Sequence, residues 1–343
     1  RQVWEDTISR HPMLRTAFVW EELDEPLQVV RQKVDMPFEL EDWQNLDSDQ
    51  KHEHLQRFLQ QDRQQGYNLA KAPLMRLNLF RTAPDRHQFV WSFHHLLTDG
   101  WSCAIILKEV FTTYKALCLG QSPKLPQPRP FRDYIAWLQK QDSSIAEAFW
   151  RRKLLGFNAS TSLRVNKQPD RQSLFENSHY EYKYTLSDQT TEALQKLAQA
   201  NRMTLNTILQ GAWTILLSRY SGDSDVLFGA TVSGRPSELS GVEDMVGMFI
   251  NTLPVRVQID PETKLIPWLK TLQNELLELR QYEYSSLANI QNWSELPHGQ
   301  ALFDLIVVFE NYPIDSSVFR NEHHVMEVRS IRYLEQSNYP LSL

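Results

Sequence analysis

The feature that most constrains the fold of this chain is the run His-His-Leu-Leu-Thr-Asp-Gly at residues 94–100. It lies between a predicted strand and a predicted helix. Phe89, Trp91 and Phe93 alternate with smaller or polar residues, which predicts a strand before the run. Beyond it, apolar residues recur at helical spacing and predict a helix over 101–119. Because histidine exchanges protons near neutral pH, a pair of histidines at such a junction is a candidate for acid–base chemistry.

The two histidines have competing interpretations. If the strand continues through them, His94 and His95 point to opposite faces and cannot both serve one site. Each is either a catalytic base or a core histidine bonded to a backbone carbonyl, and the residues alone leave both open. A metal site is not favoured, because no other His or Cys pair lies nearby in the sequence.

Asp99 also has two interpretations. It either caps the helix that follows, a role that Ser102 can share, or forms a buried ion pair with an arginine. The candidate partners are Arg10, Arg15 and Arg235.

Strands and helices alternate in two runs, which predicts an α/β (α+β) fold made of two halves. We expect a first half over 1–157, a polar linker without periodicity over 158–178, and a second half over 179–343. The expected elements of the two runs include a hairpin of strands 75–81 and 87–94, helices 49–65 and 131–141, a strand at Tyr180–Leu186 and an apolar helix at Leu205–Tyr220. The chain begins without Met and ends on what looks like a starting strand, so we expect a fragment of a longer protein.

Composition removes several classes of protein. The formal charge of −6 and the absence of a long basic run disfavour nucleic acid as the ligand. No apolar run reaches the length of a membrane span, and we expect no membrane association. The two cysteines fall on one predicted helix, which favours a reducing, cytoplasmic compartment. No glycine-rich phosphate loop or nucleophile elbow is present, so direct joining of two substrates is favoured over a covalent enzyme intermediate.

Residues 94–102 resemble the His-His-x-x-x-Asp-Gly core motif of the condensation domains of nonribosomal peptide synthetases. Other segments resemble further motifs of that family in the family's order, and the matches span nearly the whole chain. They are the arginine motif at 10–18, Tyr-x-x-Trp at 134–137, Gly-x-Phe-x-Asn-Thr at 247–252, and late segments at 303–313 and 338–341.

The resemblance implies a fold and a reaction. The family has two chloramphenicol acetyltransferase-like halves arranged as a V, with an active-site tunnel between them. Donor and acceptor arrive on the phosphopantetheine arms of two peptidyl carrier proteins, next to an adenylation domain of the same synthetase. The acceptor's α-amine attacks the donor thioester, and no cofactor is bound to the condensation domain itself.

The resemblance also assigns roles to residues. It implies that His95 is catalytic within the group His94, His95, Asp99 and Gly100, where Gly100 lets the backbone approach the tunnel. Asp99 would be structural, with Arg10 as the favoured partner over Arg15 and Arg235. The residues expected to line the tunnel are Trp101, Ser102, Asn251 and Thr252.

Variants of the family remain as alternatives. The presence of both histidines disfavours a heterocyclisation domain, and the residues after Asp-Gly look more like a former of peptide bonds between an L-donor and an L-acceptor than an epimerisation domain. A noncatalytic module that docks carrier proteins is one alternative, and an acyltransferase that takes a free amine or alcohol is another. The family's opening motif and closing stretch are absent from this chain.

Overall fold

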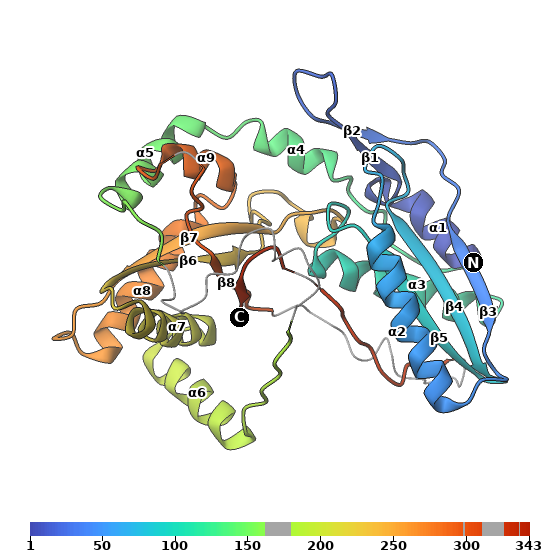
Figure 1. Cartoon of the computed structure of the whole chain (residues 1–343). Helices are drawn as coiled ribbons and strands as arrows, with labels where there is room; N and C mark the ends of the chain where they lie inside the picture. Colours follow the sequence, from blue (N-terminus) through green and yellow to red (C-terminus); the bar gives the residue numbers. More distant parts are fainter. Residues whose placement is uncertain (162–179, 298, 311–325, 336) are drawn as a thin grey trace. The chain divides into compact units, whose positions relative to one another are not determined.

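The computed structural model describes residues 1–161, 180–297, 299–310, 326–335 and 337–343 (Figure 1). The chain forms two compact units, each built from segments distant in sequence. Unit 1 contains Arg1–Gln139, Arg235–Phe249 and the described part of 312–331. Unit 2 contains the described parts of Lys140–Gly234, Ile250–Asn311 and Arg332–Leu343. The segment Arg235–Phe249 therefore leaves unit 2, packs in unit 1 and returns.

Unit 1 is built on a three-stranded sheet with the order β3-β4-β5 and a separate pair β1-β2. Its helices and strands are α1 (Gln2–Arg10), β1 (Thr16–Val19), β2 (Leu27–Val30), β3 (Phe38–Asp42), α2 (Ser48–Gln65), β4 (Met75–Ala83), β5 (Arg86–Phe93), α3 (Gly100–Cys118) and α4 (Arg132–Leu138), with short 3-10 turns η1 (Pro12–Arg15) and η3 (Val242–Asp244).

The expected hairpin is confirmed, because β4 and β5 pair antiparallel with Leu77 opposite Trp91. Strand β3 was not expected from the sequence; it pairs parallel to β4 and its side chains are mostly exposed. Helices cover both faces of this sheet. Trp4 of α1 packs on Trp91 with ring centroids 5.0 Å apart, whereas Phe58 of α2 packs on Phe80 of the other face at 5.0 Å (Figure 1).

Unit 2 is built on a four-stranded sheet with the order β7-β6-β8-β9. Its elements are α5 (Ser143–Leu154), α6 (Asp188–Asn201), α7 (Leu205–Ser221), β6 (Asp225–Val232), β7 (Asn251–Gln258), α8 (Leu265–Arg280), α9 (Leu287–Trp293), β8 (Leu305–Val307) and β9 (Leu341–Ser342). Strands β6 and β7 form a long antiparallel pair, and their apolar residues join those of α5, α7 and α8 in one core.

The units do not coincide with the halves expected from the sequence. Helix α5 falls within the expected first half, 1–157, but it packs in unit 2. Phe149 stacks on Tyr282 with ring centroids 3.9 Å apart, and the indole N–H of Trp150 donates to the hydroxyl of Ser285 at 3.0 Å. Most of the expected linker, 158–178, lies outside the described residues.

The strand expected at Tyr180–Leu186 is wrong. These residues belong to no strand or helix, and Tyr180, Tyr182 and Tyr184 are 94%, 89% and 76% exposed. Alternation alone predicted the strand, but a strand also needs a neighbour to accept its backbone hydrogen bonds, and none of the described strands pairs with this segment.

Candidate functional site

The turn between β5 and α3 positions the two histidines. Strand β5 ends at Phe93, and the chain turns where the N–H of Leu97 donates to the carbonyl of His94 at 3.0 Å. The expectation that the two rings lie on opposite faces of a continuing strand therefore does not apply. Their hydrogen bonds distinguish them instead.

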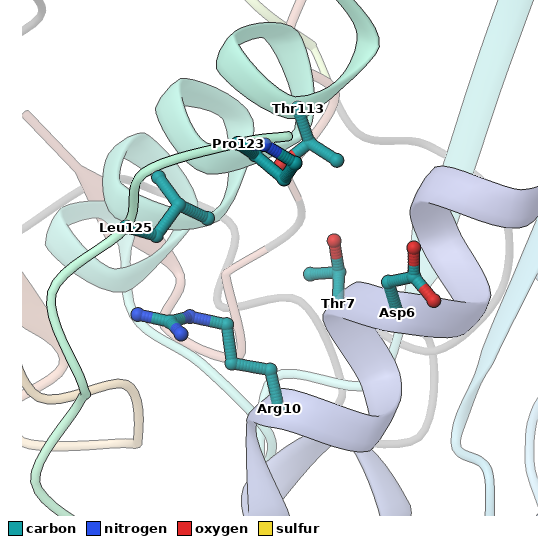
Figure 2. Close-up of a pocket in the computed structure, with 6 residues that line it drawn as sticks. All are labelled: Asp6, Thr7, Arg10, Thr113, Pro123 and Leu125. Carbon is teal, nitrogen blue, oxygen red and sulfur yellow. The ribbon is translucent and has the colours of Figure 1, made fainter. Parts of the chain in front are cut away.

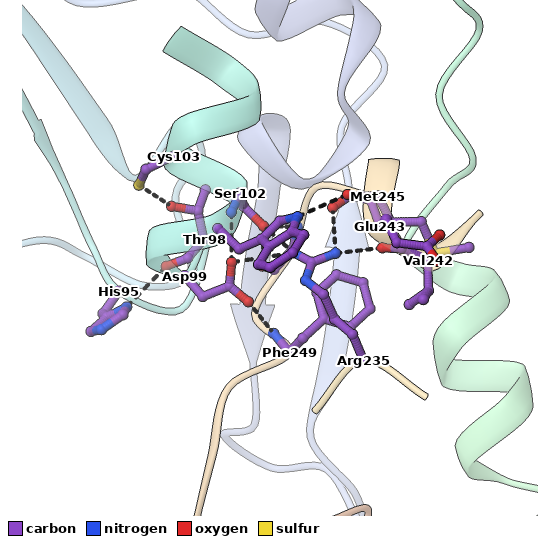
Figure 3. Close-up of polar contacts among 12 residues, drawn as sticks. His95, Thr98, Asp99, Ser102, Cys103, Arg235, Val242, Glu243, Met245 and Phe249 are labelled. Atoms are coloured by element: carbon purple, nitrogen blue, oxygen red, sulfur yellow. Dashed lines mark hydrogen bonds and ion pairs between the residues drawn. The ribbon is translucent and has the colours of Figure 1, made fainter. Parts of the chain in front are cut away.

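His95 has one defined ring contact. Its Nδ1 lies 2.9 Å from the carbonyl oxygen of Thr98 (Figure 3). Because a carbonyl only accepts, Nδ1 must carry the proton, which leaves the lone pair of a neutral ring on Nε2. The residue is exposed. His95 thus presents a proton acceptor of fixed tautomer on the surface of unit 1.

His94 has the opposite arrangement. The N–H of Leu96 donates to its Nδ1 at 3.1 Å, so this nitrogen is the acceptor in the neutral ring. Burial lowers the pKa of His94, and the neighbouring His95 lowers it further. The ring meets Tyr67 edge to face, with centroids 6.1 Å apart. His94 therefore supports the turn as a neutral, packed side chain.

Asp99 joins the start of α3 to the segment Arg235–Phe249. The carboxylate is the N-cap of α3 and accepts the N–H of Ser102 at 2.7 Å. It also accepts the N–H of Phe249 at 3.1 Å and a guanidinium N–H of Arg235 at 3.3 Å (Figure 3). The cap and the ion pair, which the sequence offered as alternatives, are both present.

Arg235 is the partner of Asp99, and its own side chain is 5% exposed. It donates to the carbonyls of Val242 and Met245 as well, and its guanidinium lies 3.9 Å from the centre of the Phe249 ring. Burial lowers the pKa of Arg235, and Asp99 opposes that effect. The arginine thus gathers the segment 235–249 around the acid that caps α3.

Arg10 and Arg15 do not pair with Asp99, which corrects our preference for Arg10. The Arg10 Nε donates to Glu109 at 3.0 Å, and His11 shares the same carboxylate at 2.6 Å. Arg10 is the last residue of α1, α1 packs on α3, and Glu109 lies in the middle of α3, away from its capped end. Arg15 donates to the backbone carbonyl of Arg31.

Ser102 does not line a surface. It is fully buried, and its hydroxyl donates to the carbonyl of Gly247 at 2.8 Å while accepting N–H groups of Gly247 at 3.1 Å and Arg235 at 2.9 Å. Trp101 is half-buried and its indole N–H donates to the carbonyl of Glu243 at 2.9 Å. Both residues follow Gly100, the first residue of α3, and their hydrogen bonds attach the segment Arg235–Phe249 to this helix.

Asn251 and Thr252 belong to unit 2, at the start of β7. The side-chain amide of Asn251 donates to the carbonyls of Glu283 at 2.9 Å and Ser285 at 2.7 Å, and its oxygen accepts the N–H of Thr252. Asn251 therefore secures the loop after α8. Its expected contact with a substrate stays a prediction, as does that of Thr252.

The structure gives the reason for Gly247, which the sequence marked only as part of a motif, and it adds Glu109, which the sequence did not single out. A Cβ on Gly247 would lie 2.1 Å from Cδ2 of Phe131, so the close packing of the segment Arg235–Phe249 requires glycine there. Glu109 lies 98 residues from His11, and no local pattern indicates that its carboxylate contacts the side chains of both Arg10 and His11.

A cavity of about 290 Å³ opens elsewhere in unit 1, between α1, α3 and the loop that carries Pro123 and Leu125 (Figure 2). Its lining residues are Asp6, Thr7, Arg10, Thr113, Pro123 and Leu125, which include none of the turn 94–100. Within the described residues no group of three or more His, Cys, Asp or Glu side chains is arranged to hold a metal ion. We therefore place the candidate site at the turn that carries His95.

Comparison with known proteins shows the family of this chain. The model of the family described as "Condensation domain" matches residues 1–343, and the chain belongs to that family. One of the linear gramicidin synthase proteins of Brevibacillus parabrevis is 46% identical over 100% of this chain, and chondramide synthase of Chondromyces crocatus is 43% identical over 99%. The chain spans only 7% and 8% of those two proteins.

Solved structures share the fold. The first condensation domain of the calcium-dependent antibiotic synthetase, in complex with a substrate analogue, has a TM-score of 0.73 at 19% identity. That match covers 91% of this chain and 71% of the other. A four-domain nonribosomal peptide synthetase bound to AMP and glycine has a TM-score of 0.76 at 18% identity, over 92% of this chain and 24% of the other. The mixed helix and sheet of this chain is therefore a condensation-domain fold.

Proposed function

We propose that this domain forms a peptide bond in nonribosomal peptide synthesis, with His95 as the proton acceptor. The observation that carries the proposal is the hydrogen bond from Nδ1 of His95 to the Thr98 carbonyl, 2.9 Å long, which leaves Nε2 free to take a proton. The identity with peptide synthases over the whole chain supports it.

The reaction joins two thioester-bound substrates. The α-amine of the acceptor attacks the donor's thioester carbonyl, so a C–N bond forms and the C–S bond breaks. The amine loses one proton to Nε2 of His95, and the departing sulfur takes up one proton as the thiol. An unperturbed α-amine has a pKa of about 7.7–8.0, so a substantial fraction of it is already neutral near physiological pH and the base needs to contribute only modestly to its deprotonation.

Orientation contributes more than basicity in this scheme. General-base catalysis gives about 10²–10⁴-fold, whereas well-oriented reactants reach effective molarities of roughly 10⁵–10⁸ M. Asp99 and Arg235 serve orientation, because they fix the start of α3 and thereby the turn that carries His95. We assign them a structural role, and we keep Gly100 and Trp101 as proposed neighbours of the substrate.

The partners follow from the reaction. We propose that donor and acceptor are held on the phosphopantetheine arms of two carrier proteins, that an adenylation domain of the same synthetase activates the monomer, and that both residues joined are L-configured. Antibiotic-type peptides are the product class indicated by the relatives' names, gramicidin and bacitracin. None of the described helices is long and apolar enough to span a membrane. A cytoplasmic location is part of this proposal.

A condensation assay in the full-length parent protein tests the proposal. Donor and acceptor are loaded on their own carrier proteins, and the dipeptidyl thioester is measured by mass spectrometry for the wild type and for His95→Ala. We expect product from the wild type and a loss of at least about 100-fold in the variant. Failure of the wild type with a broad panel of loaded residues, while carrier binding persists, would favour a docking module; turnover with a free amine would favour an acyltransferase.

A further inference from the structure

The side chain of Thr98 makes a contact that the proposed reaction does not use. Its hydroxyl lies 3.1 Å from the sulfur of Cys103, one turn into α3 (Figure 3). Thr98 is 0% exposed and Cys103 is 5% exposed, so water does not compete with this contact. The contact is separate from the Asp99–Arg235 pair, which holds the same turn from its other side.

The contact between Thr98 and Cys103 affects His95 because Thr98 also supplies the carbonyl that the His95 ring bonds. The carbonyl that accepts Nδ1–H of His95 belongs to Thr98, the residue whose side chain Cys103 holds. A carbonyl keeps its direction only if the backbone of its residue is fixed, and a buried hydrogen bond from the side chain restricts that backbone. Cys103 of α3 thereby fixes the side chain of Thr98, and the carbonyl of Thr98 fixes the imidazole of His95.

We propose that Thr98 and Cys103 are positioning residues that keep His95 in the Nδ1–H tautomer. Because both residues are buried, we assign neither of them a contact with a substrate. Their contact lets the turn keep one ring orientation with Nε2 outward, although the ring itself is exposed. The proposal deepens the proposed function, since it concerns the same histidine, but the tautomer can be measured without any turnover.

The first test is nitrogen NMR of protein labelled with 15N in its histidines, with the His95 signals assigned by their loss in His95→Ala. At a pH where the ring is neutral, the wild type should show Nδ1 as the protonated nitrogen. Thr98→Val keeps the shape of the side chain but removes the hydroxyl, and should move the His95 signals toward the tautomer mixture of free imidazole. Thr98→Ser keeps a hydroxyl and should restore the wild-type pattern.

Changes at the partner complete the set. Cys103→Ala should resemble Thr98→Val, and Cys103→Ser should retain the wild-type pattern, because a hydroxyl replaces the thiol. The matched control is Thr16→Val: Thr16 is also 0% exposed and also loses a hydroxyl, which donates to the carbonyl of Pro12 at 2.9 Å. This control should leave the His95 signals unchanged.

Kinetics gives the second readout. Single-turnover condensation should slow by about tenfold in Thr98→Val, the effect of one hydrogen bond of about 1.4 kcal/mol, and recover in Thr98→Ser. If Thr98→Val keeps the wild-type tautomer, or shifts it no more than Thr16→Val does, the inference is wrong. If Thr98→Val and Cys103→Ala shift the tautomer as expected but the wild type makes no peptide bond, the proposed function fails and the inference stands.

Discussion

The buried pair of Asp99 and Arg235 predicts a specific loss of stability when the acid is neutralised. The two side chains are 4% and 5% exposed, and Asp99→Asn leaves the guanidinium without its counter-charge. Breaking a buried ion pair from one side costs about 3–5 kcal/mol. Arg235 still donates to the carbonyls of Val242 and Met245 in this variant. We therefore expect the lower end of that range, a decrease of about 3 kcal/mol in the free energy of unfolding. Asparagine still caps a helix, so the cap contributes little to this loss.

Urea unfolding followed by tryptophan fluorescence measures this loss. Asp47→Asn is the matched control, because Asp47 caps α2 by accepting the N–H of Gln50 at 2.8 Å but is exposed and has no guanidinium partner among the contacts described. The control should change the free energy of unfolding by less than about 0.5 kcal/mol. If Asp99→Asn is as stable as the control, and especially if it is stable but inactive, Asp99 acts in the chemistry and the structural assignment is refuted.

Three further predictions concern packing, pH and the loop of unit 2. Gly247→Ala should lower the free energy of unfolding by about 1–3 kcal/mol through the clash with Phe131, and Phe131→Leu should recover part of it in urea titrations of the double variant. Burial raises the pKa of Glu109, but His11 and Arg10 lower it more, to below its ordinary value of 4.5. A lowered carboxyl pKa stabilises the fold at pH values above the unfolded pKa, and this contribution is lost as the pH falls through the folded pKa. The stability deficit of Glu109→Gln at pH 7 should therefore shrink as the pH falls below 4.5; an unchanged deficit would contradict the ion pair. Asn251→Ala should speed amide hydrogen exchange in residues 282–286, with Asn201→Ala, an exposed amide bonded to Leu197, as the unaffected control.

Local elements were predictable because their causes are local. The alternation of Phe89, Trp91 and Phe93 and the turn before it were enough for the hairpin β4-β5, and the helical spacing after Gly100 was enough for α3. The strand at Tyr180–Leu186 shows the limit of the same reasoning, because pairing depends on a partner that alternation does not identify. Strand β3 was missed because it is short and mostly exposed: Phe38 and Leu40 are its only apolar residues, and it gains its place by pairing with β4.

The site was predictable in its motif but not in its contacts. The run 94–100 marked His95 and Asp99, yet the partner of Asp99 lies 136 residues away, and the sequence ranked Arg10 above Arg235. The resemblance assigned Ser102 and Asn251 to the substrate tunnel. In the structure the Ser102 hydroxyl bonds the backbone of Gly247, and the Asn251 amide bonds the backbone of the loop after α8. These long-range contacts leave no local signal in the sequence, and the substrate contact of Asn251 stays a prediction.

The most direct test of this account separates chemistry from folding at the turn 94–100. Single-turnover condensation and urea unfolding are measured on the same preparations of wild type and His95→Ala in the parent protein. Because His95 is exposed and its ring bonds only the Thr98 carbonyl among the contacts described, we expect the variant to have an unfolding free energy within about 0.5 kcal/mol of wild type and a condensation rate at least about 100-fold lower. A variant that keeps the wild-type rate, or that loses its rate only by unfolding, would contradict the assignment of His95 as the proton acceptor.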